Sequence, residues 1–450
     1  MTRSYKILKV MSAVLLALAF TACEPDFDFN TEFDHGRMPE AGTPAGGRVP
    51  SENTRSVLLL YSAGYNDLSK FLSEDIAELK ANWLPGKHRS ENVLLIYSHL
   101  PAMGNDFSTP NPPVLTRVWK KDDGGVVTDT LVVYAPDARS ATSSQLNEVL
   151  SYVKETFPAK SYGMIFSSHA TGYLPAGYYS NPKGYVFQDR KVMGMYSAGD
   201  RFVEYVAPVY DPELPAVKSI GQDRVMMDGP TRSYEMELNG FADAIPMYME
   251  YILFDACLMG GVEVAYGLKD KCRYLGFSQA EVLAEGFDYS RVTTHLLAGE
   301  SPDPQGVCED YFNQYIIQSG VYQSATISMI DCSRMDRLAD VCGILFEKYR
   351  DAIASVSPGR VQRFFRGDYH WFYDLKDILI EAGVSDEDMA SVDEALDECV
   401  VYKGYTPRFM NVFDIEVFSG FSMYLPCNGG EELDKYYKTL QWNIDTGLVI

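Results

Sequence analysis

Short apolar segments alternate with amphipathic ones along most of the chain. The apolar segments are rich in β-branched and aromatic residues, which predicts β-strands; they are residues 56–64, 92–100, 129–136, 161–170, 251–257, 272–280 and 324–332. Between them, apolar residues recur at helical spacing in 66–84 and in 143–157, where Ser143 or Ser144 is a plausible N-cap. Apolar strands separated by helices are typical of an α/β fold whose mostly parallel central sheet is covered on both faces.

Two regions interrupt this alternation. Residues 171–245 are rich in Gly, Tyr and Asp and only locally periodic, which predicts a loop-rich insertion in an α/β body of residues 54–332. The rest, residues 333–450, mixes helical and β-like patterns at about 335–355, 386–398 and 417–426. We expect this last part to form a C-terminal mixed α/β subdomain.

The first residues combine a basic start with a short apolar run. Arg3, Lys6 and Lys9 precede MSAVLLALAF, which is too short to span a membrane as a mature helix. This order is typical of a secretory signal peptide, here residues 1–22. The small residues of FTAC, directly before Cys23, resemble a bacterial lipoprotein processing site, which implies cleavage before Cys23 and lipidation of that residue. The alternative is an ordinary signal peptide cut nearby.

Residues 23–53 are acidic and then rich in Gly and Pro, which predicts a flexible tether from the lipid to the folded body. The acidic residues after Cys23 resemble the export signals of surface lipoproteins in the Bacteroides group. No second segment is long enough for a transmembrane helix. The sequence therefore predicts an exported protein, lipid-anchored to the bacterial cell envelope at the outer membrane, with surface exposure as one option.

The net charge of the chain limits the kinds of partner that it is expected to bind. The 450 residues include 39 Lys and Arg against 62 Asp and Glu, a formal net charge of −23. This balance argues against binding to nucleic acid or to an anionic membrane surface, and it allows a cationic substrate. The same charge also aids solubility without any role in binding. We expect a monomer.

The cysteines have wide and irregular spacings, which argues against a disulfide scaffold. The eight are Cys23, Cys257, Cys272, Cys308, Cys332, Cys342, Cys399 and Cys427. The sequence contains no CxxC pair and no HExxH motif, so a structural zinc site is not expected. Lipidation of Cys23 would leave an odd number of thiols, which fits one free nucleophile.

The segment YILFDACLMGGVEVAYGLKDK, residues 251–271, places Cys257 between a predicted strand and a predicted helix, 258–270. A helix N-terminus lowers the pKa of a thiol, and the thiolate is the nucleophilic form. His169 ends another predicted strand, so parallel strands would bring both residues to one edge of the sheet as nucleophile and general base. The alternative for Cys257 is a small buried apolar residue.

Asp255 lies two residues before Cys257, on the same side of the predicted strand. A carboxylate so close would raise the pKa of the thiol, because like charges repel. It is tolerable if it points into a pocket and meets a cation, such as the Arg or Lys side chain of a substrate. Asp255 therefore reads as a specificity residue; the alternative is a carboxylate that caps the following helix.

Five segments together resemble the clostripain family of cysteine peptidases, relatives of caspases, legumains and gingipains. They are VLLLYSAGYNDL with its acidic helix, IFSSHATG, LFDACLMGGVEVAYGLKD, SQAEVLAEGFDY and GFSMYLP, in family order over most of residues 55–426. The resemblance implies a caspase-like three-layer α/β/α sandwich and a catalytic dyad of His169 and Cys257. It also implies that Asp255 lies in the primary specificity pocket, and that the protein cleaves proteins or peptides after Arg or Lys.

Some members of the family mature by cutting the loop between the His and the Cys. Here the basic residues of that loop are Lys183, Arg190, Lys191, Arg201, Lys218 and Arg224. The cysteine peptidase reaction requires no cofactor, so we expect none. Calcium is used by some members, but no DxDxDG loop indicates a calcium site here.

The surroundings of His169 differ from the family pattern, which has an Asp before the His and glycines after it. Here the residues are Ser167-Ser168-His169-Ala170-Thr171-Gly172. The resemblance implies that the backbone N–H groups of Cys257 and Ala170 hold the oxyanion. It also implies that the segment 278–289 supplies part of the pocket wall, where the available acids are Glu281, Glu285 and Asp288.

Two other functions stay open. A catalytically inactive caspase-like surface lipoprotein could bind peptides or glycans, and the altered His169 motif motivates this alternative. A serine hydrolase is the other, because GFSQA at 276–280 loosely resembles a nucleophile elbow at Ser278. The helix expected after such an elbow is interrupted by Gly286 and Phe287.

Overall fold

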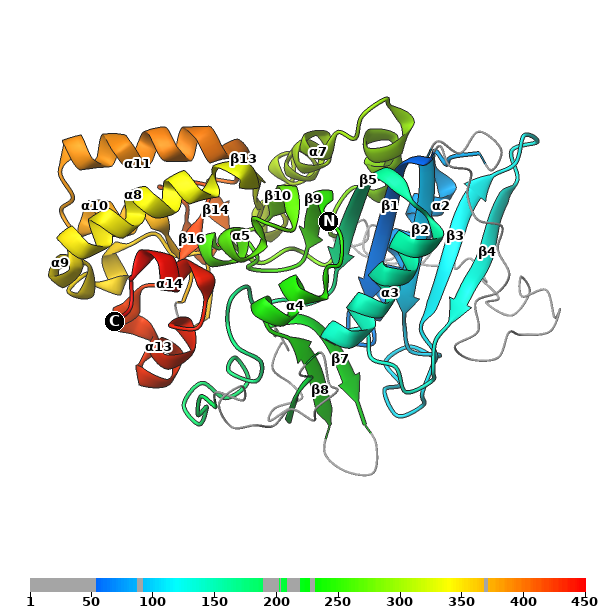
Figure 1. Ribbon diagram of the computed structural model, residues 1–450, viewed down its shortest axis with the longest axis horizontal. Helices are drawn as coiled ribbons and strands as arrows, with labels where there is room; N and C mark the ends of the chain where they lie inside the picture. Colours follow the sequence, from blue (N-terminus) through cyan, green and yellow to red (C-terminus); the bar gives the residue numbers. More distant parts are fainter. Residues whose placement is uncertain are drawn as a thin grey trace, which may run out of the picture. The chain divides into compact units, whose positions relative to one another are not determined.

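A mixed β-sheet of nine strands forms the centre of the protein in the computed structural model (Figure 1). The structure describes residues 54–86, 92–188, 202, 204–208, 219–226, 231–367 and 371–450, and all of them belong to one compact unit, Ala41–Ile450. The predicted signal peptide, the tether and Cys23 lie outside these residues.

The five central strands of the sheet are parallel, and the strands at both edges are antiparallel. In sheet order they are β13 (Val400–Tyr405), β11 (Thr326–Asp331), β10 (Cys272–Phe277), β9 (Met249–Asp255), β5 (Ala159–Ser167), β1 (Thr54–Ala63), β2 (Asn92–His99), β3 (Val114–Lys120) and β4 (Val126–Val133). The parallel strands are β10, β9, β5, β1 and β2. The crossovers between them place helices on both faces of the sheet.

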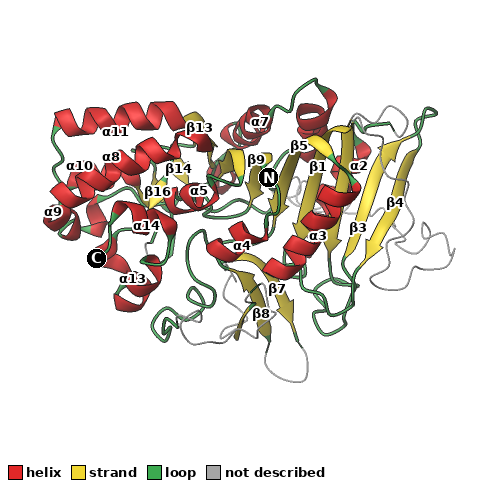
Figure 2. Ribbon diagram, in the orientation of Figure 1, coloured by secondary structure: helices red, strands yellow, loops and turns green. Residues whose placement is uncertain are grey.

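Alternate residues of the central strands belong to two separate cores. In β1, Val57 and Leu59 pack into one core while Leu58 and Leu60 pack into the other. The first core contains residues of α3 (Ser143–Thr156), α4 (Leu238–Ala244), α5 (Val262–Leu268) and α8 (Met335–Lys348). The second contains residues of α2 (Ser69–Ala81), α6 (Tyr289–Thr293) and α7 (Pro304–Ile316). The predicted α/β/α sandwich is therefore confirmed, with strands between two helical layers (Figure 2).

The remaining elements are short. The strands are β6 (Tyr205–Pro208), β7 (Ile220–Val225), β8 (Arg232–Met236), β12 (Tyr373–Asp374), β14 (Arg408–Phe409), β15 (Phe413–Asp414) and β16 (Ser422–Met423). The helices are α9 (Arg350–Ala354), α10 (Leu375–Glu381), α11 (Asp386–Cys399), α12 (Pro426–Gly429), α13 (Glu431–Tyr437) and α14 (Gln441–Thr446).

The insertion predicted at 171–245 contains regular structure. Its described residues include the antiparallel sheet β6–β8–β7 and the helix α4. Both β7 and β8 lie below the carboxyl ends of the parallel strands in Figure 1. An isolated bridge between Ala170 and Ile220 ties β7 to the segment after β5, so the insertion borders the edge at which the candidate site was predicted.

Two expectations about elements are wrong. The helix predicted at 258–270 begins only at Val262, after a turn, and Gly261 is its N-cap. The β-like segment 417–426 contains only the two-residue strand β16. The C-terminal residues also join the main body, because β13 pairs with β11 and completes the sheet.

Candidate active site

The pairing of β5 with β9 brings His169 and Cys257 to the same edge of the sheet. Ser167 pairs in register with Asp255, and the two strands are parallel. His169 and Cys257 each lie two residues beyond this pair, where both strands have just ended. The condition on which the dyad was predicted, two parallel strands with a common carboxyl edge, is therefore met by direct neighbours.

The chain turns sharply after Cys257. Leu258 has a positive φ of 60°, which is strained for a residue with a branched side chain, and it is fully buried. Its N–H donates to the carbonyl of Ala280 at 2.9 Å. Gly172, three residues after His169, packs against this turn: a Cβ there would lie 2.4 Å from the carbonyl oxygen of Leu258. The loops that carry His169 and Cys257 are thus in direct contact.

Burial disfavours the reactive thiolate form of Cys257. The residue is partly buried; the N–H of Val282, which donates to Sγ at 3.3 Å, opposes this effect. Burial, with the negative charge of Glu281 as the next cause, raises the pKa of the thiol to about 12. The expected lowering by a helix N-terminus is wrong, because α5 begins five residues after Cys257.

His169 is oriented by a residue that the sequence analysis missed. Nε2 of His169 lies 2.7 Å from Oδ1 of Asp67, in the loop between β1 and α2. Burial alone would raise the pKa of Asp67, but the hydrogen bond and charge of His169 hold it at about 2. The other oxygen of Asp67 is 3.4 Å from Nη1 of Arg224 in β7. An acid directly after an apolar strand was the available signal.

Ala170 is fully buried beside β7. The N–H of Gly221 donates to the carbonyl of His169 at 3.0 Å, and the N–H of Thr171 donates to that of Ser219 at 2.8 Å. Neither of these two hydrogen bonds uses the N–H of Ala170. The prediction that this N–H binds the oxyanion requires that the two bonds leave it unused. The prediction that the N–H of Cys257 also binds the oxyanion depends on the conformation of the turn that follows Cys257.

Asp255 is buried and does not cap α5. Its Oδ2 accepts hydrogen bonds from the Tyr289 hydroxyl at 2.9 Å and from Ser167 Oγ at 3.5 Å. Burial raises the pKa of this carboxyl above its ordinary value, and the hydrogen bonds oppose the rise. The alternative of a helix cap is excluded, since the cap of α5 is Gly261.

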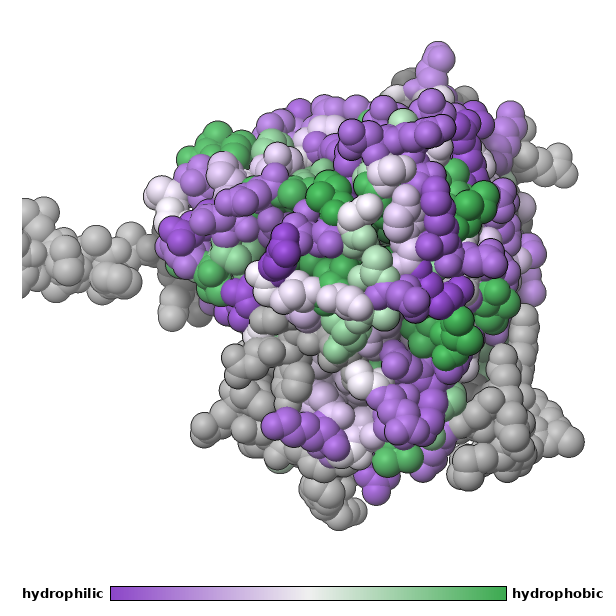
Figure 3. Space-filling view, turned by 90° about the vertical axis from the view of Figure 1, so that its left-hand side faces the viewer, coloured by the Kyte–Doolittle hydropathy of each residue, from purple (hydrophilic) through white to green (hydrophobic). Residues whose placement is uncertain are grey.

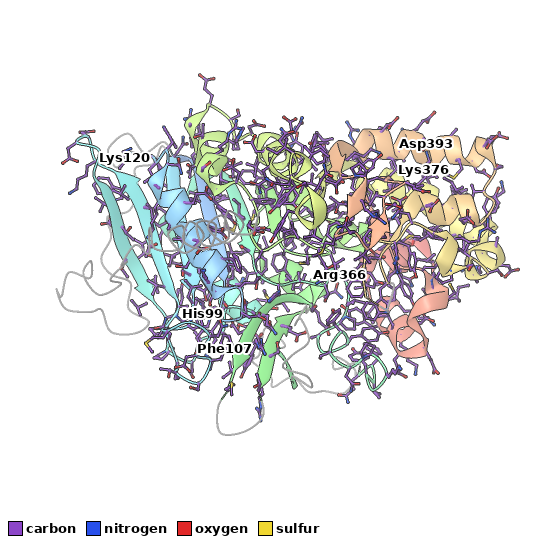
Figure 4. All side chains as sticks on the ribbon, turned by 180° about the vertical axis from the view of Figure 1, so that it is seen from behind. His99, Phe107, Lys120, Arg366, Lys376 and Asp393 are labelled. Carbon is purple, nitrogen blue, oxygen red and sulfur yellow. The ribbon has the colours of Figure 1, made fainter. Side chains whose placement is uncertain are left out.

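The three acids of the segment 278–289 lie in different surroundings. Glu281 is buried beside Cys257 and accepts from Nε of Arg366 at 2.9 Å; Arg366 comes from the C-terminal part of the chain and is labelled in Figure 4. Glu285 is exposed. Asp288 is the N-cap of α6, where its side chain accepts from the N–H of Ser290.

Another buried acid lies near Asp255. It is Asp75 in α2, whose pKa is raised by burial and then by the charge of Asp255. The sequence analysis did not single it out, because Asp75 lies in a helix far from the segments that carry the dyad.

Ser278 does not form a nucleophile elbow. It is fully buried, its Oγ donates to the carbonyl of Ala280 at 3.0 Å, and it shares a 2.8 Å hydrogen bond with Oγ1 of Thr326. These contacts give it a structural role and engage its hydroxyl with neutral partners.

The candidate cleavage positions in the insertion are not equivalent. Arg224 lies in the paired strand β7, is 8% exposed, and its N–H donates to the carbonyl of Tyr65. It is therefore a poor site for proteolysis, which needs an accessible extended segment. Lys183 is exposed. The others, Arg190, Lys191, Arg201 and Lys218, lie outside the described residues.

Within the part of the chain that the structure describes, no group of His, Cys, Asp or Glu is arranged to hold a metal ion. No helix among the same residues is long and apolar enough to cross a membrane.

Comparisons with known proteins agree with this geometry. The chain matches the profile of the clostripain family (Peptidase C11) over residues 60–196 and 188–447. A similar structure is that of an inactive zymogen C11 protease from Parabacteroides distasonis, with 24% identity, a TM-score of 0.67, and coverage of 88% of this chain and 99% of that chain. Another is a secreted C11 cysteine protease from Bacteroides thetaiotaomicron, with 23% identity, a TM-score of 0.66, and coverage of 87% and 99%.

The Bacteroides thetaiotaomicron protease is also known in complex with an irreversible peptide inhibitor, and that structure has 22% identity and a TM-score of 0.65, with coverage of 88% of this chain and 99% of that chain. At these identities the likeness shows the fold. No curated protein matches the chain.

Proposed function

Because the chain belongs to the clostripain family of cysteine proteases, we propose that it is an endopeptidase that cleaves after Arg, and also after Lys, through His169 and Cys257. The observation that carries the proposal is the β5–β9 register, which starts both active-site loops from one paired position. Asp255, buried at that same position, is proposed to receive the basic side chain of the substrate.

The proposed mechanism uses groups of this chain alone. With Nε2 of His169 donating to Asp67, the other ring nitrogen, Nδ1, is free to accept the proton of the Cys257 thiol. The thiolate attacks the carbonyl carbon of the scissile bond, and the N–H groups of Cys257 and Ala170 stabilise the oxyanion. His169 then protonates the leaving amine, and water hydrolyses the thioester.

We propose that the uncut chain is a latent form. The raised thiol pKa leaves little thiolate near neutral pH, although the N–H of Val282, which donates to Sγ, opposes the rise. Cleavage in the insertion would free β7, which is attached to both the His169 loop and Asp67. The fold similarity to a protease described as an inactive zymogen supports this reading.

A second candidate is an inactive surface lipoprotein that binds peptides or glycans. The observation that favours it is again the raised pKa of Cys257, since a neutral buried thiol is a weak nucleophile. A nicked protein that stays unreactive toward thiol-directed peptide probes would support this alternative.

We further propose that the protein is exported and anchored by a lipid on Cys23. The test is metabolic labelling with palmitate of wild type and of a Cys23→Ala variant. Loss of the label would support the anchor, and an unchanged label would refute it.

We also propose that the protein acts as a monomer without a cofactor. Figure 3 shows separate apolar areas among hydrophilic ones, and no large continuous apolar patch, on the face it draws. Unchanged activity in EGTA would support independence from calcium.

The test of the proposed function is cleavage of fluorogenic peptides that end in Arg, Lys or Asp. We expect wild-type protein to cleave after the basic residues only, and to do so after nicking by trypsin, whereas Cys257→Ala and His169→Ala treated in the same way should be inactive but folded. Cys427→Ala, which removes another accessible thiol, is the matched control and should keep full activity. Equal cleavage by Cys257→Ala would refute the proposal.

A further inference from the structure

Asp75 occupies a core-facing position of α2. It lies between Leu72 and Leu79, which are both buried, and is itself only 8% exposed. Among the described residues it forms no hydrogen bond or ion pair. A buried carboxyl group without a partner destabilises the fold, and an apolar residue would suit this position better. Its presence therefore calls for a ligand that supplies the missing partner.

Asp75 lies on the helix that packs against α6, and Tyr289 of α6 donates to Asp255. Asp75 and Asp255 therefore lie in one region of the fold, where burial and then the charge of Asp255 raise the pKa of Asp75 well above its ordinary value. The other titratable groups that face Asp75 are Glu74 and Glu78 of its own helix, Tyr289 of α6 and Tyr315 of α7. None of these described groups is a cation, so none of them neutralises the pair.

Gly286 packs directly against Asp255. Gly286 has a positive φ of 57°, and a Cβ there would lie 2.4 Å from Oδ2 of Asp255. Glycine therefore allows the backbone of this loop to lie against the carboxylate, where any side chain would clash with it. The Tyr289 hydroxyl, which donates to the same oxygen at 2.9 Å, fixes its direction.

We infer that Asp75 is a second specificity-determining residue, which together with Asp255 binds the cationic end of the substrate residue that precedes the scissile bond. The inference rests on the proposed function and adds to it a carboxylate from a different layer of the fold. Two carboxylates around one guanidinium match the number of its donors better than a single one.

The pair gives substrate binding a pH dependence. Without a cation, the two neighbouring carboxyls share a proton near neutral pH. A bound guanidinium or ammonium favours ionisation of both, so that proton passes to the buffer. Affinity for basic substrates should therefore rise with pH across the neutral and mildly alkaline range, and binding should release a proton.

The first experiment is calorimetric titration of the folded, inactive Cys257→Ala protein, full length and after nicking by trypsin, with Nα-acetyl-arginine amide in phosphate and in Tris. The two buffers differ in ionisation enthalpy, so the difference in heat counts protons released. We expect proton release on binding, and a Cys257→Ala, Asp75→Asn protein should lose it together with about tenfold or more of the affinity. Binding that is unchanged by Asp75→Asn, or no binding at all, would overturn the inference.

The second experiment measures kinetics and stability of Asp75→Asn against Glu74→Gln. Glu74 is the adjacent acid, exposed and 3.8 Å from Lys70, and its variant should behave as wild type. Asp75→Asn should raise KM for Arg peptides, flatten its pH dependence, and raise Tm, because a buried carboxyl without a partner is removed. A lower Tm with equal loss of activity on all peptides would indicate a merely structural role.

The two proposals can fail separately. If the wild-type protein cleaves no peptide but Cys257→Ala still binds the arginine derivative with proton release through Asp75, the endopeptidase proposal fails and the cation site stands. If wild type cleaves after Arg and Asp75→Asn does so equally well, the endopeptidase stands and the role of Asp75 is refuted.

Discussion

Asp67 holds the His169 side chain through a hydrogen bond. It binds Nε2 of the imidazole at 2.7 Å and is itself supported by Arg224 from the insertion. The hydrogen bond fixes which ring nitrogen is engaged by Asp67, so in the proposed mechanism Asp67 is a positioning residue rather than a catalytic one. It also connects the state of the insertion to the catalytic base.

Replacement of Asp67 by Ala should lower kcat on the order of a hundredfold, with little change in KM, because the base loses its orientation but the substrate pocket is untouched. Asp67→Asn, which keeps a hydrogen-bond acceptor, should restore part of the rate. The measurement is steady-state kinetics on one Arg peptide. A change confined to KM would contradict the positioning role.

The pKa of Asp67 makes a second measurement informative. Because the folded value is about 2 and the ordinary value is 3.8, the contribution of Asp67 to stability is complete above the ordinary value and is lost as the pH falls toward 2. The denaturant midpoint of unfolding should therefore fall more between about pH 5 and pH 2.5 in wild type than in Asp67→Asn. Equal falls in the two proteins would contradict this contribution.

Site residues could be predicted from the sequence where they lie at or just after the end of a strand. His169, Asp255 and Cys257 follow apolar runs, and the topology of a parallel sheet brings such residues together. Asp67 and Asp75 could not be predicted in the same way, because their roles depend on the path of a loop and the rotation of α2. The pKa of Cys257 was mispredicted because the turn before α5 is not apparent from periodicity.

The short helix α5 connects the active-site turn to the C-terminal residues. Glu263 in its first turn is 1% exposed, and its Oε1 accepts from the N–H of Tyr424 at 2.8 Å and from the Tyr437 hydroxyl at 2.7 Å. Burial raises the pKa of Glu263 to about 7. The position of α5, and so of the turn that holds Cys257, depends on this buried carboxyl.

The free energy of unfolding should depend on pH through Glu263. A carboxyl whose pKa is higher in the folded state than its ordinary value of 4.5 favours folding at low pH, and this advantage is lost as the pH rises to about 7. Glu263→Gln should remove a part of the pH dependence on the order of a few kcal/mol. Denaturant unfolding at pH 5 and pH 8 measures it, and parallel curves for the two proteins would contradict the assignment.

Elements with a clear pattern were predictable, and others were not. The fully apolar runs of β1, β5 and β9 indicated buried parallel strands, as the structure shows. β3 was missed because Thr116 and Arg117 interrupt its apolar pattern, although Arg117 is 8% exposed in the fold. The predicted helix of 258–270 joined a turn and a helix that only tertiary contacts separate.

Segments far apart in the sequence contribute to one site. The loop after β1 supplies Asp67, the insertion supplies Arg224, and the C-terminal part supplies Arg366 beside Glu281. The N–H of Ser422 also donates to the carbonyl of Gly260 in the turn after Cys257. A cut in the insertion can therefore change the site without separating it from the rest of the body.

The most direct test of the account is covalent labelling of the trypsin-nicked protein by a peptidyl acyloxymethyl ketone that ends in Arg, followed by peptide mapping with mass spectrometry. The account predicts a single adduct on Cys257, absent after His169→Ala, and no adduct from the same reagent ending in Asp. Labelling of Cys427 at an equal rate would contradict the dyad, and equal labelling by the Asp reagent would contradict the acidic pocket.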